Sequence, residues 1–129
     1  MPRRLIAVLT AFLLAVVACS SSTDYGSGGS NPPPSADVQI VSGASVKGAS
    51  AFDPNPFTVS LGGAATVDVE WRNADGITHT VTADGASPLF SSGNVAPGNT
   101  FHFSFSAAGS YGYHCSIHPT MVGTIEVTP

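Results

Sequence analysis

Charged side chains are scarce in this 129-residue sequence: Asp, Glu, Lys and Arg make up 9% of it, against about 25% in an average soluble domain. Basic residues are the scarcest, with four Lys and Arg against eight Asp and Glu. Binding to nucleic acid needs a stripe of basic residues that displaces counterions from the phosphates, so this composition excludes nucleic acid as a partner. Hydrophobic residues form 43% of the chain, which excludes a chain kept disordered by its charge.

The N-terminal apolar run is too short to span a membrane. Residues 5–18 form a 14-residue run in which Thr10 is the only polar side chain, whereas a spanning helix needs about 20 apolar residues. Arg3 and Arg4 precede the run and small residues end it. This pattern is typical of a secretory signal peptide, which we assign to residues 1–18.

The end of the signal peptide carries one of only two cysteines. Residues 16–19 read Val-Val-Ala-Cys and resemble the bacterial lipobox, in which cleavage precedes the cysteine and the thiol is acylated. Residues 19–36 would then be a lipidated Cys19 followed by a flexible tether rich in Ser, Gly and Pro. We expect a bacterial extracytoplasmic domain, periplasmic or at the cell surface, anchored to a membrane by its lipid. The alternative is an ordinary signal peptide that happens to contain a cysteine.

The second cysteine, Cys115, has no partner if Cys19 is lipidated. An unpaired thiol is a liability in an oxidising compartment, so the sequence should contain a specific use for it. Methionine is as scarce, because Met121 is the only one besides Met1.

Residues 37–129 alternate between apolar and polar side chains, with turn residues every 8–12 positions. No window beyond the signal peptide has a helical period. The pattern predicts a single all-β domain, a two-sheet β-sandwich of seven to eight strands. The predicted strands lie near residues 38–40, 57–61, 67–72, 77–82, 101–106, 111–115 and 121–128.

The same alternation assigns several polar side chains to the inside of the sandwich. His79 shares its parity with Ile77 and Val81, whereas Thr80 takes the outward parity. Cys115 and Met121 also fall on inward positions. An inward histidine without a partner is unfavourable, because its ring nitrogens need hydrogen bonds or a metal.

Cys115, His118 and Met121 follow one another at three-residue intervals in a single predicted loop. Together with His79 they offer one thiolate, two imidazoles and a weak thioether, which is the blue-copper ligand set. Zinc prefers four strong donors and calcium prefers oxygens, so neither suits this set. A nucleophilic Cys115 with His118 as its base would need an orienting third group, and none is identifiable.

The domain resembles the cupredoxins, the small blue copper proteins, over residues 37–129. The resemblance runs through FDPNPFTV at 52–59, VEWRN at 69–73 and THTV at 78–81 to the Cys115 loop. It is closest to the plastocyanin-like group, and the short Cys-x-x-His-x-x-Met spacing is similar to amicyanin.

The resemblance implies a Greek-key sandwich with one copper at one end. His79 would be the upstream ligand, Cys115 and His118 the loop ligands, and Met121 the long axial ligand. The His118 ring edge would be the electron port. An apolar docking patch of Pro119, Val122 and residues 88–90 would surround it. The implied protein is a monomer and not an enzyme, and it meets redox protein partners transiently through small interfaces.

The sequence departs from the family directly after the upstream histidine. Many members have an asparagine there whose side chain ties the two ligand loops together, whereas this chain has Thr80. Thr is shorter and stiffer, and bonds of this kind tune ligand orientation, so the rigidity and reduction potential of the site are open.

The sequence therefore predicts a membrane-tethered type 1 copper protein that shuttles one electron. The alternative is an extracytoplasmic copper-binding module for storage, delivery or sensing of copper.

Overall fold

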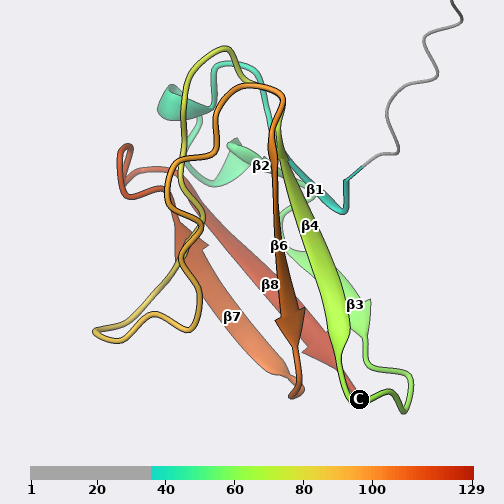
Figure 1. Cartoon of the computed structure of the whole chain (residues 1–129). Helices are drawn as coiled ribbons and strands as arrows, with labels where there is room; N and C mark the ends of the chain where they lie inside the picture. The colour runs from blue at the N-terminus through green and yellow to red at the C-terminus, as the bar shows by residue number, and fades with distance from the viewer. Residues whose placement is uncertain (1–35) are drawn as a thin grey trace, which may run out of the picture. The chain divides into compact units, whose positions relative to one another are not determined.

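The computed structural model describes residues 36–129, which form the β domain (Figure 1). The predicted signal peptide, Cys19 and all but the last residue of the predicted tether lie outside the described residues. Within residues 36–129, no helix is long and apolar enough to cross a membrane.

In residues 36–129, eight strands form two four-stranded sheets, which confirms the all-β sandwich predicted from the sequence. One sheet has the order β2-β1-β4-β6 and the other the order β3-β8-β7-β5. The strands are β1 (Val38–Ile40), β2 (Phe52–Asp53), β3 (Phe57–Ser60), β4 (Val67–Asn73), β5 (Thr82–Ala83), β6 (Thr100–Phe105), β7 (Gly109–His114) and β8 (Val122–Thr128). Two single-turn 3-10 helices, η1 (Ala44–Val46) and η2 (Gly48–Ser50), lie between β1 and β2.

Alternating burial on the long strands explains why the two sheets face each other. On β4, Val69, Trp71 and Asn73 are buried and the residues between them are half-buried. On β8, Gly123, Ile125 and Val127 are buried. Because side chains on a strand alternate between its two faces, one face of each sheet contributes to a shared core.

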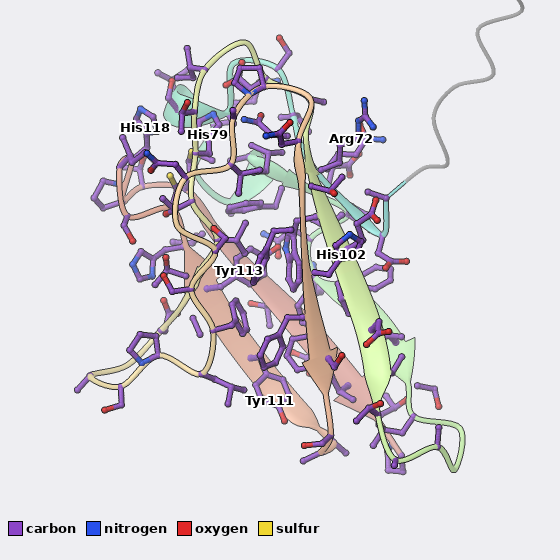
Figure 2. The ribbon with its side chains drawn as sticks, viewed as in Figure 1. Arg72, His79, His102, Tyr111, Tyr113 and His118 are labelled. Carbon is purple, nitrogen blue, oxygen red and sulfur yellow. The ribbon has the colours of Figure 1, made fainter. Side chains whose placement is uncertain are left out.

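Aromatic rings fill the centre of this core. Trp71 of β4 lies edge-on to Tyr113 of β7, with ring centroids 5.6 Å apart, and so joins the two sheets. Figure 2 shows Tyr113 and Tyr111 between the sheets. Burial raises the pKa of Tyr113 above its ordinary value, so this phenol stays protonated.

The structure corrects two expectations about the segment between β4 and β6. The predicted strand at 77–82 is mostly loop, because only β5 and an isolated bridge from His79 to Val95 have strand pairing. Ile77 is therefore 45% exposed instead of inward. Phe90 is buried against Trp71 in the core, so it is not part of the exposed patch that the resemblance implied.

The connections at one end of the sandwich carry the candidate ligands. The β7–β8 hairpin turns through residues 115–121, and the β4–β5 connection passes through residues 74–81. Both lie at the end away from the C-terminus, near η1 and η2 (Figure 1). The antiparallel register of β7 and β8, with His114 opposite Val122, fixes the width of the first loop.

Gly123 shows how closely this hairpin is packed, since a Cβ added there would lie 2.4 Å from Tyr113 Cζ. We expect Gly123→Ala to lower the free energy of unfolding of the metal-free domain by about 1–3 kcal/mol, because the buried ring would have to move. The matched control is Gly109→Ala on β7, whose Cβ would meet Tyr111 at an ordinary 3.5 Å. Urea denaturation of both variants measures the difference, and equal stabilities would contradict this account of the packing.

Candidate metal centre

The 115–121 loop begins and ends at strand termini. Cys115 directly follows β7 and Met121 directly precedes β8. Two backbone hydrogen bonds close the loop: Cys115 N donates to Met121 O at 3.1 Å, and Met121 N donates to His118 O at 2.9 Å. The short Cys-x-x-His-x-x-Met spacing therefore makes one tight turn that brings the Cys and His side chains together.

His79 approaches this turn from the other connection. Its backbone pairs with Val95: His79 N donates to Val95 O at 3.2 Å, and Val95 N donates to His79 O at 2.8 Å. This two-way pairing holds a residue that is not part of a long strand. Figure 2 shows the His79 and His118 side chains side by side at this end of the sandwich.

Three side-chain atoms form a compact triangle of donors. Cys115 Sγ lies 3.8 Å from His79 Nδ1 and 3.8 Å from His118 Nδ1, and the two nitrogens are 3.2 Å apart. These three residues form a group that could hold a metal ion, with all ligand atoms within 4.8 Å of one another. His79 and Cys115 are fully buried, while His118 is partly exposed.

The triangle has the right size for a first-row transition metal. A point in its plane about 2.0 Å from both nitrogens falls about 2.2 Å from the sulfur, close to the lengths of about 2.0–2.1 Å and 2.3 Å that nitrogen and thiolate keep to zinc. Two imidazoles and one thiolate in a trigonal arrangement are the donors of a blue-copper site. The residues present therefore fit a type 1 copper ion.

Met121, the fourth residue of the predicted set, is also fully buried. Its backbone oxygen accepts the hydrogen bond from Cys115 N. This bond holds the Met121 main chain next to that of Cys115, where the 115–121 loop begins and ends. Its thioether as the weak axial donor stays a prediction from the sequence.

The second ring nitrogen of His79 contacts a carboxylate. Asp75 Oδ2 lies 2.8 Å from His79 Nε2, and Asp75 is only 9% exposed. Hydrogen bonds from the Gly43 amide and then from the His79 ring hold the pKa of Asp75 well below its usual range. Both carboxylate oxygens already accept from backbone N–H groups, Oδ1 from Gly43 N and Gly76 N and Oδ2 from Ala44 N. This set of donors is the environment of a carboxylate that carries no proton, so Nε2 is the donor to Asp75.

Asn73 shapes the connection that carries both residues. The buried Asn73 Nδ2 donates to Ile77 O at 2.8 Å and to Val95 O at 2.9 Å. Its Oδ1 accepts from Asp75 N at 2.9 Å. One amide side chain thus contacts Asp75 and Ile77 of this connection and Val95 of the β5–β6 connection, whose carbonyl also accepts from His79 N.

Thr80 is buried rather than outward-facing, which corrects the parity expected from the sequence. Its backbone N donates to Cys115 Sγ at 3.3 Å, and its hydroxyl oxygen accepts from Ser116 N at 2.7 Å. Thr80 therefore ties the two ligand loops together, the role that the sequence comparison left open. The difference from a regular strand arises because residues 77–81 leave the sheet after β4.

The other two histidines lie outside the donor triangle. His102 contacts Glu70 at 3.3 Å on the outer face of the β4–β6 pair, with 61% of its side chain exposed. His114 contacts Asp84 at 2.6 Å and is partly exposed.

Asp75 and Asn73 are parts of the site that the sequence pattern did not indicate. Two features could have indicated more: Asp75 stands four positions before the candidate ligand His79, and buried Asn and Asp side chains commonly hydrogen-bond to loop backbone.

Comparison with known proteins points to one family. The model of the copper-binding proteins of the plastocyanin/azurin family matches residues 39–128. A plastocyanin from Scenedesmus fuscus is 33% identical over 103 residues, covering 70% of this chain and 99% of the relative.

Solved structures agree in fold. A purple cupredoxin from Nitrosopumilus maritimus superposes with a TM-score of 0.63 at 28% identity, over 73% of this chain and 100% of the other. A copper-containing nitrite reductase from Thermus scotoductus SA-01 matches with a TM-score of 0.54 at 26% identity, over 71% of this chain and only 22% of the reductase.

The bond from Ser116 N to the Thr80 hydroxyl gives a direct test of the tie between the loops. Thr80→Val keeps the side-chain shape but removes the acceptor of this amide, so we expect a loss of about 0.5–1.5 kcal/mol in the free energy of unfolding, the usual net contribution of one hydrogen bond that is not fully buried. Thr80→Ser retains the oxygen and is the matched control. Amide exchange by NMR should show faster exchange at Ser116 in the valine variant only; slow exchange there would argue against the tie.

Proposed function

Because this chain belongs to the plastocyanin/azurin family of copper-binding proteins, we propose that it is a one-electron carrier. Its copper would be held by His79, Cys115 and His118, with Met121 as the weak axial ligand. The family match and the donor cluster confirm copper as the cofactor. The observation that carries the proposal is the compact triangle of one sulfur and two Nδ1 atoms.

Bound copper supplies one-electron chemistry by alternating between Cu(II) and Cu(I). The protein contributes a set of donors that need not rearrange between the two states. Cys115 Sγ is fixed by Thr80 N, and the thiol loop is closed by its own backbone hydrogen bonds. His79 and Cys115 are fully buried, which would shield the copper from water on their side.

His118 would be the electron port, because it is the one member of the donor triangle that reaches the surface. Its neighbours Ile117, which is 48% exposed, and Pro119 are exposed too. Ile77, near His79 in the chain, adds a further exposed apolar side chain. An apolar surface of this kind suits brief contacts with redox protein partners, which need only small interfaces.

A copper module for storage, delivery or sensing remains the competing function, because it would use the same donors. The likeness to a nitrite reductase covers only a small part of that enzyme, so it supports the fold and not an enzymatic activity.

Two measurements on the copper-loaded domain separate these functions. An electron carrier should be reduced and reoxidised rapidly and reversibly by small redox mediators, with copper retained throughout. A delivery module should instead cycle slowly and lose copper to an apoprotein acceptor or a chelator. Loss of copper on reduction would overturn the carrier proposal.

We further propose that lipid on Cys19 holds the domain at a bacterial membrane, outside the cytoplasm. The support is the run of residues 16–19 after a short apolar segment and the Ser, Gly and Pro-rich stretch that follows. A tether of this composition would let the domain move between partners near the membrane surface.

Replacing the proposed thiolate ligand gives the sharpest spectroscopic test. Cys115→Ser should abolish the intense visible absorption that a cysteine thiolate gives to Cu(II), because a hydroxyl does not replace that donor. His102→Ala, at an exposed position outside the triangle, is the control and should retain the full spectrum. Absorption and EPR spectra of the copper-loaded variants decide, and a blue Cys115→Ser protein would exclude Cys115 as a ligand.

Removal of the lipidation cysteine tests the anchor separately. Cys19→Ser should move the protein from the membrane fraction to the soluble fraction after cell lysis, because the acyl chains provide the membrane affinity. Ser20→Ala is the matched control and should stay with the membranes. Sedimentation of the serine variant with the membranes would contradict lipidation.

A further inference from the structure

One carboxylate gathers four hydrogen-bond donors at the candidate copper site. Asp75 Oδ1 accepts from Gly43 N at 2.9 Å and from Gly76 N at 2.8 Å. Its Oδ2 accepts from Ala44 N at 3.2 Å and from His79 Nε2 at 2.8 Å. Both oxygens are thus engaged, and they join three separate groups: the start of η1, the loop of Asp75 itself, and the ring of His79.

This arrangement fixes the His79 ring from both sides. Nε2 points to Asp75, while Nδ1 points to Cys115 Sγ and His118 Nδ1. Turning the ring over would remove Nδ1 from the donor triangle and leave a buried carboxylate oxygen with one donor fewer. Among residues 36–129, Asp75 is the only acidic side chain hydrogen-bonded to a member of the donor triangle.

We propose that Asp75 is the positioning residue of the copper centre, and that its charge favours Cu(II) over Cu(I). The hydrogen bond to Nε2 leaves Nδ1 as the metal-binding nitrogen before the ion arrives. A fixed negative charge next to the ligand stabilises the more positive oxidation state and so lowers the reduction potential. This inference rests on the proposed copper ligation by His79.

A purely structural role for Asp75 would be limited to its three backbone donors. Gly43, Ala44 and Gly76 could be held in the same way without any contact to His79. The bond to Nε2 is the feature that such a role does not need. Measurements that report on the His79 ring and on copper therefore distinguish positioning from simple support of the loop.

The first test uses the unmodified Cu(I)-loaded protein, which is diamagnetic and suits NMR. The His79 Nε2–H should give a resolved imidazole proton resonance that exchanges slowly with water, because it is buried and bound to Asp75. The ring N–H of partly exposed His118 provides the internal comparison and should exchange much faster. Exchange of the His79 proton as fast as that of His118 would overturn the proposal.

The second test is Asp75→Asn. An asparagine presents one oxygen and one NH₂ group, so in either orientation the NH₂ faces N–H donors. We expect Cu(II) affinity, measured by chelator competition, to fall about 10–100-fold, and Cu(I) affinity to fall less. Each tenfold difference between the two losses raises the reduction potential by about 59 mV, which voltammetry checks independently.

Glu70→Gln is the matched control, since it also removes one negative charge and one carboxylate–histidine contact, from exposed His102. It should leave both copper affinities and the potential unchanged. If Asp75→Asn behaves like Glu70→Gln, the positioning role is wrong while the copper site stands. If the unmodified protein binds no copper at the triangle, the proposed function itself fails. If Asp75→Asn does not fold, the exchange rate of the His79 proton decides.

Discussion

The rest of the site depends on one constraint: three donor atoms from two separate connections must stay within 4.8 Å of one another, with His79 and Cys115 buried and His118 partly exposed. Neither connection is a regular strand at the point where it contributes its donors. The protein therefore has to hold them by hydrogen bonds that are not part of the sheets. Thr80, Asn73 and Asp75 supply these bonds, since each side chain hydrogen-bonds to backbone groups outside the strands.

The two connections are held in different ways, one by the register of a β-hairpin and the other by hydrogen bonds within a loop. The β7–β8 pairing places Cys115 and Met121 opposite each other, so a seven-residue turn is enough to present a thiol and an imidazole. His79 has no such hairpin behind it. Its position depends on Val95 across the loop, on Asn73 at the end of β4, and on Asp75 at the far side of its ring. The half of the site with the weaker strand pairing is the half with the denser side-chain hydrogen bonding.

The sequence predicts the hairpin half of the site, with Cys115, better than the loop half, with His79. The Cys115 loop is local, since its ligands are three residues apart and their chemistry identifies the metal without knowledge of the fold. The alternation on β4 and β8 likewise predicts their buried faces. Parity failed at residues 77–81, because alternation assumes a strand and this segment leaves the sheet. Ile77 consequently turned out to be exposed and Thr80 buried. Asp75 was missed although His79 is only four positions away, because that spacing predicts side-chain contact in a helix and this segment is a loop. Its partners Gly43 and Ala44 lie more than 30 residues away, where no local pattern reaches.

The two histidines of the triangle are held in contrasting ways, and this contrast bears on how the site would exchange electrons. His79 is fully buried and its outer nitrogen is bound to an ionised carboxylate, so its ring is isolated from solvent and from partners. His118 is partly exposed, its Nδ1 turned toward the other donors and its neighbours Ile117 and Pro119 at the surface. A charge next to the buried ligand His79 can influence copper without contacting a partner protein. An electron that passes to another protein is best carried by the exposed ligand His118. Placing Asp75 on the His79 side therefore separates the group that tunes the ion from the surface that meets the partner.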